Sequence, residues 1–323
     1  MRVGVMWGSF MRHQKLGLVG EGHDLIRKAR EYGFDSYLLS AGRELPSLEP
    51  ADLREGKGLL DELGMTCTLN SGLLRRVREG DEDAVRRTFE AAKFLDAHSI
   101  NMTFSPGMNT RWKEGWDEQT ASEYVKRDTE DAVGLAEFAE EYEVPVAIEN
   151  HLDYILGEIG TILDAVPSDY VGLNFDTANP LLFLQSPMDF VRRFAGRIFS
   201  THLKDGYILP DPDGARVVWC NIGEGIVDIP GILSVLNDQD RETALNLEYW
   251  AQAAHEVPYE TEAYWDHLLL SREEAAPMRE CFEQDLAKGR PELSSDDHEG
   301  LEDEIRVMKS VPGYVRELWD ELD

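Results

Sequence analysis

The chain has 323 residues, 42% of them hydrophobic, which is enough for one large α/β barrel or two ordinary domains. Its formal net charge of −31 argues against an electrostatic grip on nucleic acid or on an anionic membrane, and its three Cys residues form neither a disulfide framework nor a zinc motif. There is no signal-peptide pattern and no apolar run near the roughly 18 residues that span a membrane, so we expect a soluble, cytoplasmic protein, whose carboxylate excess is typical of a halophilic source.

The first half of the chain alternates short apolar strands with amphipathic helices. We predict strands at residues 2–7, 34–40, 65–70 and 99–106. Helices are predicted between them at residues 22–33, 50–63 and 81–98. A loop at 107–119 contains two tryptophans, and Thr120 with Glu123 forms a capping-box pattern for a long helix that runs to about Glu143.

The second half repeats this alternation and then stops. Strands are predicted at residues 144–150, 170–176, 197–204 and 243–249. Helices are predicted near residues 157–166, from Ser186-Pro187 onward, and at the end of the segment 221–236. Residues 256–323 read as two or three acidic helices, broken near 289–291 and again near 312–313.

Eight strands that alternate with helices over about 250 residues have the size and pattern of a (β/α)8 TIM barrel. An open, doubly wound sheet is the competing fold. We predict a barrel over residues 1–255, followed by a C-terminal helical extension over residues 256–323 that either covers the barrel or makes an oligomer contact.

Four of the predicted strands end at a side chain that can bind a metal ion. These side chains are Glu149, Asp176, His202 and Glu248. Since function sits at the carboxyl ends of parallel strands, we expect the four to meet on one ion. Three carboxylates and one imidazole suit Mn²⁺, Mg²⁺ or Co²⁺ better than a thiolate-type structural zinc. Such an ion would polarise a sugar carbonyl and stabilise an enediolate, while Glu149 and Glu248 would move protons on the two faces of the substrate.

The stretches VAIENH, GLNFDTANP, STHLKDG, NIGEGIVD and LNLEYW resemble, in this order and spacing, the xylose isomerase-like TIM-barrel superfamily of sugar isomerases and epimerases. That superfamily also contains endonuclease IV, but the additional histidines of a three-zinc nuclease site are missing here. The resemblance covers residues 1–255 and implies that Glu149, Asp176, His202 and Glu248 are metal ligands. In the ketose epimerase branch, the two Glu residues are also the acid/base pair.

Three further positions take their meaning from the same resemblance. Lys204 and Asp205 match the signature at the end of the seventh strand. Asn179 stands where many members carry a His that holds the substrate carbonyl oxygen. Several relatives with Asn at this position belong to other branches, which include lyases and decarboxylases of oxo sugar acids.

Other residues near the predicted strand ends each have a functional and a structural interpretation. His151 either supports the site or contacts substrate, and His13 is expected at the surface. The backbone of Gly223-Glu224-Gly225 either binds an anion or forms a tight turn, and we favour the turn. Four tryptophans either line a pocket or pack in the core: Trp7, Trp250, Trp112 and Trp116. Arg111 and Lys113 either contact an acidic substrate or lie in a solvated loop, and we favour the loop.

From these patterns we predict a divalent-metal-dependent sugar isomerase or epimerase that acts through an enediolate on a ketose or related sugar derivative. A dehydratase or decarboxylase of an oxo sugar acid on the same site is the alternative, and a non-catalytic sugar-binding barrel is a third. Mn²⁺ is the expected ion, with Mg²⁺, Co²⁺ or Zn²⁺ as alternatives, and the expected assembly is a homo-oligomer, either a dimer or a tetramer. The predicted catalytic residues are Glu149, Glu248 and Lys204, and the predicted substrate contacts are Asn179, His151, Trp7 and Trp112.

Overall fold

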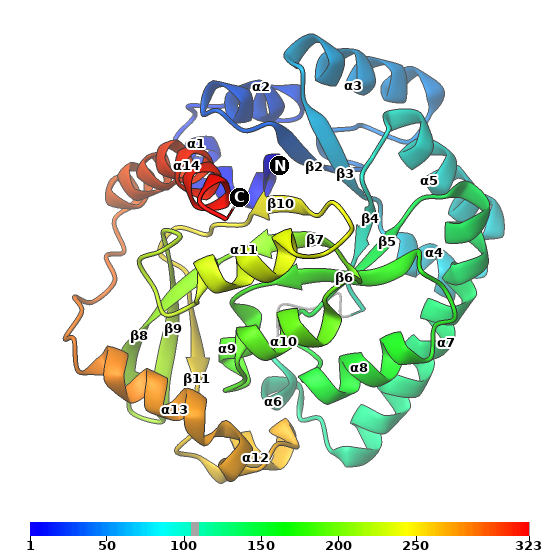
Figure 1. Ribbon diagram of the computed structural model, residues 1–323. Helices are drawn as coiled ribbons and strands as arrows, with labels where there is room; N and C mark the ends of the chain where they lie inside the picture. The colour runs from blue at the N-terminus through cyan, green and yellow to red at the C-terminus, as the bar shows by residue number, and fades with distance from the viewer. Residues whose placement is uncertain (105–109, 323) are drawn as a thin grey trace.

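A closed barrel of eight parallel strands forms the centre of the protein (Figure 1). The computed structural model describes residues 1–104 and 110–322. Around the barrel the strands follow one another as β1 (Val3–Met6), β2 (Ser36–Ser40), β3 (Thr66–Asn70), β4 (Ile100–Met102), β5 (Val146–Glu149), β6 (Val171–Asp176), β7 (Ile198–Leu203) and β10 (Ala244–Leu247). Because β10 pairs in parallel with β1, the ring closes, so the predicted (β/α)8 barrel is confirmed and the open sheet is wrong.

Helices surround this ring on the outside (Figure 1). The longer ones are α2 (His23–Glu31), α3 (Pro50–Leu63), α5 (Glu82–Leu95), α7 (Glu118–Tyr142), α8 (Leu156–Asp164), α10 (Pro187–Phe194), α11 (Ile229–Asn237) and α14 (Asp297–Asp320). Short helical turns lie between them at η1 (Trp7–Phe10), α1 (Met11–Lys15), α4 (Leu73–Arg78), α6 (Arg111–Glu114) and α9 (Asn179–Leu182). The end of the predicted fourth strand, at residues 105–106, lies outside the described residues.

The alternation of side chains along the strands decides what points into the barrel. In β6, Val171, Leu173 and Phe175 are apolar, and Phe175 stacks on Phe190 of the outer helix α10 with ring centroids 6.3 Å apart. Successive residues of a strand point to opposite sides, so the alternate positions Asn174 and Asp176 face the barrel interior.

The start of α7 differs from the prediction. The helix begins at Glu118, with Asp117 as its N-cap, and the Asp117 carboxylate accepts a hydrogen bond of 2.8 Å from the Thr120 N–H. An Asp one turn earlier satisfies the free amides of the first turn, so Thr120 lies inside the helix rather than at its cap. The predicted capping box of Thr120 and Glu123 is therefore wrong.

A small second sheet was not predicted. It consists of β8 (Asp205–Asp211), β9 (Gly214–Cys220) and β11 (Ala254–Val257), paired antiparallel in the order β11-β9-β8. β8 follows β7 after a single residue, Lys204, so the small sheet starts at the carboxyl end of a barrel strand. The helices α12 (Glu262–Leu268) and α13 (Arg272–Leu286) follow β11, and α13 packs against β8.

The C-terminal extension ends in one long helix that packs on the barrel wall against α1, α11 and β1. The predicted break near residues 289–291 is confirmed, since α13 ends at Leu286 and α14 begins at Asp297. The predicted break near 312–313 is wrong, because α14 continues through Pro312. A proline inside a helix costs about 3 kcal/mol, and burial of the flanking Val311 and Val315 at 0% exposure offsets this cost.

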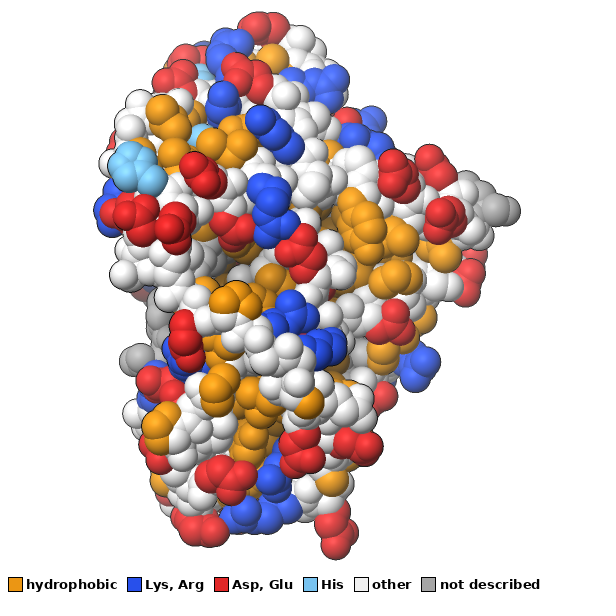
Figure 2. Space-filling model, turned by 90° about the vertical axis from the view of Figure 1, so that its left-hand side faces the viewer, with side chains coloured by type: hydrophobic (Ala, Val, Ile, Leu, Met, Phe, Trp, Pro, Cys, Tyr) orange, Lys and Arg blue, Asp and Glu red, His pale blue; other side chains and the backbone are white. Residues whose placement is uncertain are grey.

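One face of the protein shows how its acidic side chains are distributed (Figure 2). On the face shown in Figure 2, Asp and Glu side chains are interspersed with Lys and Arg and with patches of hydrophobic side chains. Within residues 1–104 and 110–322, the structure contains no helix with both the length and the apolarity that a membrane span needs.

Candidate metal centre

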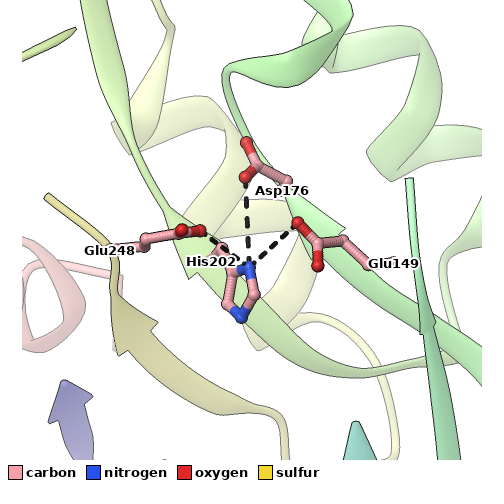
Figure 3. Close-up of side chains that lie close together, drawn as sticks. All are labelled: Glu149, Asp176, His202 and Glu248. Carbon is pink, nitrogen blue, oxygen red and sulfur yellow. Dashed lines mark hydrogen bonds and ion pairs between the residues drawn. The ribbon is translucent and has the colours of Figure 1, made fainter. Parts of the chain in front are cut away.

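Four side chains converge at the carboxyl ends of adjacent barrel strands (Figure 3). Glu149 ends β5, Asp176 ends β6, His202 lies near the end of β7, and Glu248 directly follows β10. Asp176 and His202 are Cα partners in the parallel register, which brings their inward-facing side chains to the same height. One ligand atom from each of the four residues lies within 4.8 Å of the others, and all four side chains are buried. The structure therefore brings together the four predicted side chains.

The distances centre on one nitrogen of the histidine ring. His202 Nδ1 lies 3.1 Å from Glu149 Oε1, 2.9 Å from Glu248 Oε2 and 4.0 Å from Asp176 Oδ2. Lys204 Nζ lies 2.7 Å from Asp176 Oδ2 and 2.9 Å from Glu248 Oε2. Three carboxylates and two nitrogen groups thus share one buried cluster.

This donor set fits a hard divalent cation. Asp176 Oδ2 and Glu248 Oε2 are buried and accept no hydrogen bond of good geometry from the residues that the structure describes, although the Lys204 ammonium is close to both. Buried carboxylates carry a large desolvation cost unless they are paired or coordinate a metal. Oxygen donors with a single imidazole are the ligands that Mn²⁺ and Mg²⁺ prefer. The four residues therefore suit a divalent ion at the point that their ligand atoms surround.

The pKa values of the cluster show how protons balance its charge. Burial by itself favours the neutral imidazole, but the Glu149 and Glu248 carboxylates outweigh it and raise the pKa of His202 to about 10. The pKa of Lys204 is also raised, because the three carboxylates outweigh the effect of its burial. A metal ion must therefore displace the His202 proton before Nδ1 can act as a ligand.

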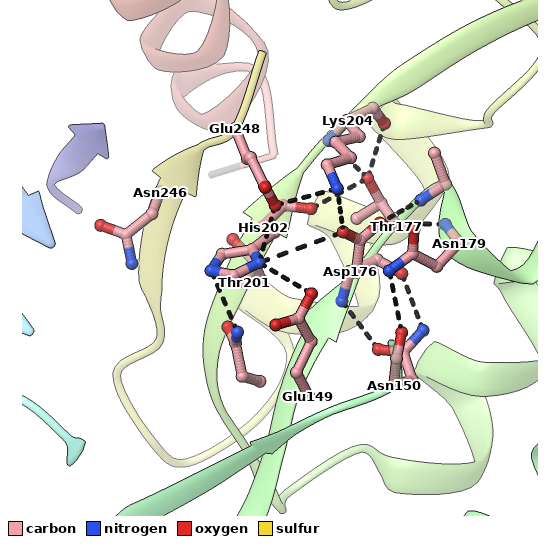
Figure 4. A network of polar contacts seen from close by, with 12 residues as sticks. Glu149, Asn150, Asp176, Thr177, Asn179, Thr201, His202, Lys204, Asn246 and Glu248 are labelled. Carbon is pink, nitrogen blue, oxygen red and sulfur yellow. Dashed lines mark hydrogen bonds and ion pairs between the residues drawn. The ribbon is translucent and has the colours of Figure 1, made fainter. Parts of the chain in front are cut away.

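Asn150 and Asn179 hold Asp176 in place (Figure 4). The Asn150 side chain accepts a hydrogen bond of 2.8 Å from the Asp176 N–H and donates one of 3.0 Å to the Asp176 carbonyl. Asp176 Oδ1 accepts hydrogen bonds from the backbone N–H groups of Ala178 and Asn179. The Asn179 side chain donates to the carbonyl of Asn150, so it helps to orient a candidate ligand, while its role as a substrate contact stays a prediction.

The backbone of Lys204 is fixed by hydrogen bonds to the Thr177 side chain. Its N–H donates a hydrogen bond of 2.8 Å to Thr177 Oγ1, and the Thr177 hydroxyl donates one of 2.6 Å to the Lys204 carbonyl (Figure 4). These two contacts join the ends of β6 and β7. They fix the backbone from which the Lys204 side chain reaches Asp176 and Glu248.

Trp250 takes part in the centre directly. Its indole Nε1 donates a hydrogen bond of 2.7 Å to Glu248 Oε1, and its ring packs edge-on against Trp7 with centroids 5.4 Å apart. Gly8 allows this arrangement, because a Cβ at that position would lie 2.9 Å from the Trp250 ring. The sequence places Trp250 two residues after the candidate ligand Glu248, but this spacing alone did not predict the hydrogen bond between them.

Two predicted surface residues are buried instead. His13 is buried, with its Nδ1 2.5 Å from Glu304 of α14 and its Nε2 2.7 Å from the Tyr32 hydroxyl, so the expected exposure is wrong. Arg111 is completely buried and pairs with Glu158, so the solvated-loop interpretation is wrong for this residue. Both errors have one cause: burial comes from elements distant in the sequence that cover these polar groups and supply their partners.

The other candidates fall into two groups. Trp112 packs edge-on against Phe183 and Tyr264, and Trp116 packs against Tyr124 and Tyr154, so both indoles contribute to packing. Lys113 pairs with Glu256. By contrast, His151 Nδ1 is buried and has no hydrogen-bond partner within residues 1–104 and 110–322.

The segment Gly223-Glu224-Gly225 is the tight turn that we favoured. The N–H groups of Gly223, Gly225 and Val227 donate to the Asp205 carboxylate, at 3.0, 2.9 and 3.0 Å. The anion that this backbone binds is therefore a side chain of the same chain.

Comparison with known proteins agrees with the fold. The family model described as xylose isomerase-like TIM barrel matches residues 26–272. The 3-oxo-isoapionate decarboxylase of Pectobacterium atrosepticum is 22% identical over 250 residues, which cover 75% of this chain and 82% of that protein.

Two solved structures illustrate the similarity in fold. The D-psicose 3-epimerase of Clostridium cellulolyticum H10, solved with D-tagatose, is 17% identical with a TM-score of 0.59, covering 88% of this chain and 99% of that chain. The IOLI protein with a binding zinc atom is 17% identical with a TM-score of 0.58, covering 92% of this chain and 100% of that chain. At this level of identity, these structures support the fold alone.

Proposed function

Because this chain belongs to the xylose isomerase-like TIM-barrel family, we propose that it is a divalent-metal-dependent enzyme that isomerises or epimerises a ketose or related sugar derivative. The observation that carries this proposal is the buried cluster of Glu149, Asp176, His202 and Glu248, whose ligand atoms surround one point at the carboxyl end of the barrel. Structural metal sites are usually closed by thiolates and imidazoles, whereas this oxygen-rich set of four would hold an ion that remains accessible to substrate.

These four residues would hold the ion, with Mn²⁺ preferred and Mg²⁺, Co²⁺ or Zn²⁺ as alternatives. When bound, the ion supplies Lewis-acid polarisation of the substrate carbonyl, which makes the neighbouring C–H group more acidic. The protein contributes the fixed positions of its carboxylates, since Asn150 and Trp250 orient Asp176 and Glu248 by hydrogen bonds.

Glu149 and Glu248 are the groups that would move the proton. Burial alone would raise the pKa of Glu149, but His202 and His151 outweigh it and lower that pKa. Burial is likewise outweighed at Glu248, whose pKa is lowered by Lys204 and His202. Both carboxylates are therefore ionised and able to accept a proton from carbon. Because they reach the centre from β5 and from the end of β10, removal by one and return by the other would invert a carbon centre.

Lys204 would serve as a hydrogen-bond donor in this scheme. The surrounding carboxylates keep its pKa raised, so it stays an ammonium group at neutral pH and donates to a substrate oxygen rather than accepting a proton. Its contacts with Asp176 and Glu248 place that donor beside the metal ligands.

A second candidate is a lyase that uses the same centre. It is supported by the likeness to 3-oxo-isoapionate decarboxylase and by Asn179 at the position where the resemblance expects a histidine. In a decarboxylation, the C–C bond to the carboxylate breaks, its electron pair moves toward the polarised carbonyl, and CO₂ leaves. A proton then returns to carbon from one of the acid/base groups. Both candidates need the same ligands, so the products distinguish them.

The test is solvent-deuterium exchange over a panel of ketoses and keto sugar acids, with CO₂ release measured in parallel. We expect exchange at the carbon next to the carbonyl, loss of exchange after chelation, and recovery with Mn²⁺. Release of CO₂ together with product formation would favour the lyase. Full turnover by a Glu248→Gln variant would instead favour a non-catalytic role for this glutamate.

Metal content is tested separately by elemental analysis. Glu149→Ala and His202→Ala should each lose the stoichiometric ion, whereas His298→Ala, an exposed histidine of α14, should retain it. Retention of stoichiometric metal by both ligand variants would contradict the assignment. The proposed homodimer or tetramer is tested by analytical ultracentrifugation of the same samples.

A further inference from the structure

The second ring nitrogen of His202 has a contact of its own inside the barrel. Nδ1 faces Glu149 and Glu248, whereas Nε2 points away from the carboxylates (Figure 3). Nε2 lies 3.1 Å from Nδ2 of Asn174. Asn174 is on β6, two residues before Asp176, and the neighbouring strand β7 carries His202. The same ring therefore contacts the candidate ligands with one nitrogen and Asn174 with the other.

Bulk water does not reach this contact. Asn174 is 1% exposed, and its Cα partners in the parallel register are Glu149 on one side and Ser200 on the other. A buried N–H group that lacks an acceptor costs the full desolvation penalty of that group. The atom that Asn174 presents to the ring therefore decides whether Nε2 is satisfied.

A histidine that binds a metal ion needs an acceptor at its second nitrogen. A neutral imidazole carries one N–H, so a ring that offers Nδ1 to an ion keeps its hydrogen on Nε2. Metal-binding histidines usually donate this N–H to a carboxylate, a carbonyl or a water, which fixes the tautomer and the orientation of the ring. The amide nitrogen of Asn174 is itself a donor and cannot fill this role.

The other end of the same amide can accept the hydrogen. Asn174 Oδ1 is buried and receives no hydrogen bond from any residue in the described part of the chain. A half-turn of the amide exchanges Oδ1 and Nδ2 and keeps the shape of the side chain. The turn costs Oδ1 no described hydrogen bond, and it brings an unused acceptor to the position from which Nδ2 now faces the ring.

We propose that Asn174 is a positioning residue of the metal centre, whose Oδ1 accepts the Nε2–H of His202 and thereby selects the tautomer in which Nδ1 can bind a divalent ion. This inference rests on the proposed function, because it requires His202 to be a metal ligand. Asn174 acts through the histidine ring rather than on the ion or the substrate. An amide suits this position, since one end donates when Nε2 is an acceptor and the other accepts when Nε2 carries the hydrogen.

A second asparagine of the barrel provides a matched control. Asn246 lies two residues before Glu248, just as Asn174 lies two residues before Asp176, and it is 0% exposed. Its Nδ2 donates a hydrogen bond of 3.1 Å to Ser200 Oγ. The same substitution at both positions therefore separates the loss of an acceptor for the ligand ring from the loss of a buried amide.

The first test is the Mn²⁺ affinity of the full chain, measured by competition with a chromogenic chelator. Asn174→Leu has a similar shape but no acceptor, and it should bind Mn²⁺ about 10–100-fold more weakly than wild type. Asn174→Asp retains an acceptor and should bind Mn²⁺ within threefold of wild type or more tightly, although it adds a buried charge. Asn246→Leu should stay within threefold of wild type.

Three results would overturn the proposal. They are an affinity of Asn174→Leu within threefold of wild type, an equal loss in Asn246→Leu, and a loss in Asn174→Asp as large as that in Asn174→Leu. A side chain that only fills space would give the last of these, because a buried carboxylate is then more harmful than a leucine.

A second measurement observes the ring directly and remains decisive if Asn174→Leu fails to fold. Protein labelled with ¹⁵N-histidine is loaded with diamagnetic Zn²⁺, and the His202 signals are assigned by NMR from their absence in His202→Gln. Wild type should show a metal-bound Nδ1 and a hydrogen-bonded Nε2–H that exchanges slowly with solvent. In Asn174→Asp this N–H signal should move to lower field, because a carboxylate is the stronger acceptor. A Zn²⁺-bound Nε2, or an N–H signal that Asn174→Asp leaves unchanged, would contradict the proposal.

The positioning role and the proposed function fail in different ways. If wild type binds Mn²⁺ and exchanges deuterium into a sugar but Asn174→Leu binds Mn²⁺ normally, the positioning role is wrong and the proposed function stands. If the variants follow the expected order but no sugar exchanges deuterium, the positioning role stands and the proposed proton transfer is wrong. Absence of Mn²⁺ binding by wild type would overturn both.

Discussion

Removal of one N–H group beside Glu248 should weaken metal binding without changing any ligand. Trp250 Nε1 donates to Glu248 Oε1 at 2.7 Å, and the side chain of Glu248 is only 9% exposed. A hydrogen bond to a charged group contributes about 1.5–3 kcal/mol, and loss of such outer contacts typically lowers metal affinity about 10–100-fold. We therefore expect Trp250→Phe to bind Mn²⁺ about 10–100-fold more weakly, since Phe retains a ring against Trp7 but donates no hydrogen bond.

The measurement is a competition titration of Mn²⁺ against a chromogenic chelator, with wild type and variant in the same buffer. Trp7→Phe is the matched control, because it trims the other ring of the same edge-on pair and leaves the Trp250 hydrogen bond intact. Two results would refute the reasoning: an affinity of Trp250→Phe within threefold of wild type, or an equal loss in Trp7→Phe. The second result would assign the effect to packing of the ring pair rather than to the hydrogen bond.

Four further outcomes test the electrostatics and packing. Mn²⁺ binding near pH 8 should release about one proton, because the pKa of His202 is raised to about 10 in the metal-free protein, and the Mn²⁺ affinity should therefore rise with pH. Calorimetry in buffers of different ionisation enthalpy measures the number of protons released, and a value of zero would contradict the prediction. Burial raises the pKa of Glu44 from 4.5 to about 7, so between these pH values the Glu44 carboxyl ionises only in the unfolded chain, and the free energy of unfolding falls by about 3 kcal/mol as pH rises. Urea unfolding of Glu44→Gln should lack this loss. Parallel pH profiles for wild type and variant would show that the loss has another origin. Glu304→Ala should lose about 3–5 kcal/mol of unfolding free energy, because it leaves His13 buried without its carboxylate partner. Glu302→Ala, a change at an exposed glutamate of the same helix, should alter the unfolding free energy by less than about 0.5 kcal/mol. Similar losses in the two variants would argue against the buried pair. With a net charge of −31, the melting temperature should rise between low salt and molar KCl as self-repulsion is screened, and a flat response would count against a halophilic origin.

The closed barrel and the meeting of the four candidate ligands were predictable because both follow from local periodicity. Apolar residues alternate along strands such as β6, and a parallel (β/α)8 ring places every strand end at one edge. Asp176 and His202 could therefore be expected at the same height before their register was known.

The orienting residues could not be predicted in the same way. Asn150 is adjacent to Glu149 in the sequence, yet its side chain acts on Asp176, which is 26 residues away. The small sheet was also not predicted. Its pairing of β8, β9 and β11 brings His255 to the Trp219 ring, which also lies close to Lys204. Neither contact leaves a periodic pattern, since each depends on the direction of a single side chain.

The sequence by itself determined the class of fold, the edge at which the chemistry gathers and the four residues that meet there, because strand alternation and strand ends are local properties of the chain. Only the tertiary structure decided which polar groups are buried and what they contact. His13 and Glu304 form a pair across 291 positions, and Pro312 is accommodated inside a helix. The physical reason is that burial and long-range pairing depend on elements that the fold brings together, and no local window of the sequence contains both partners.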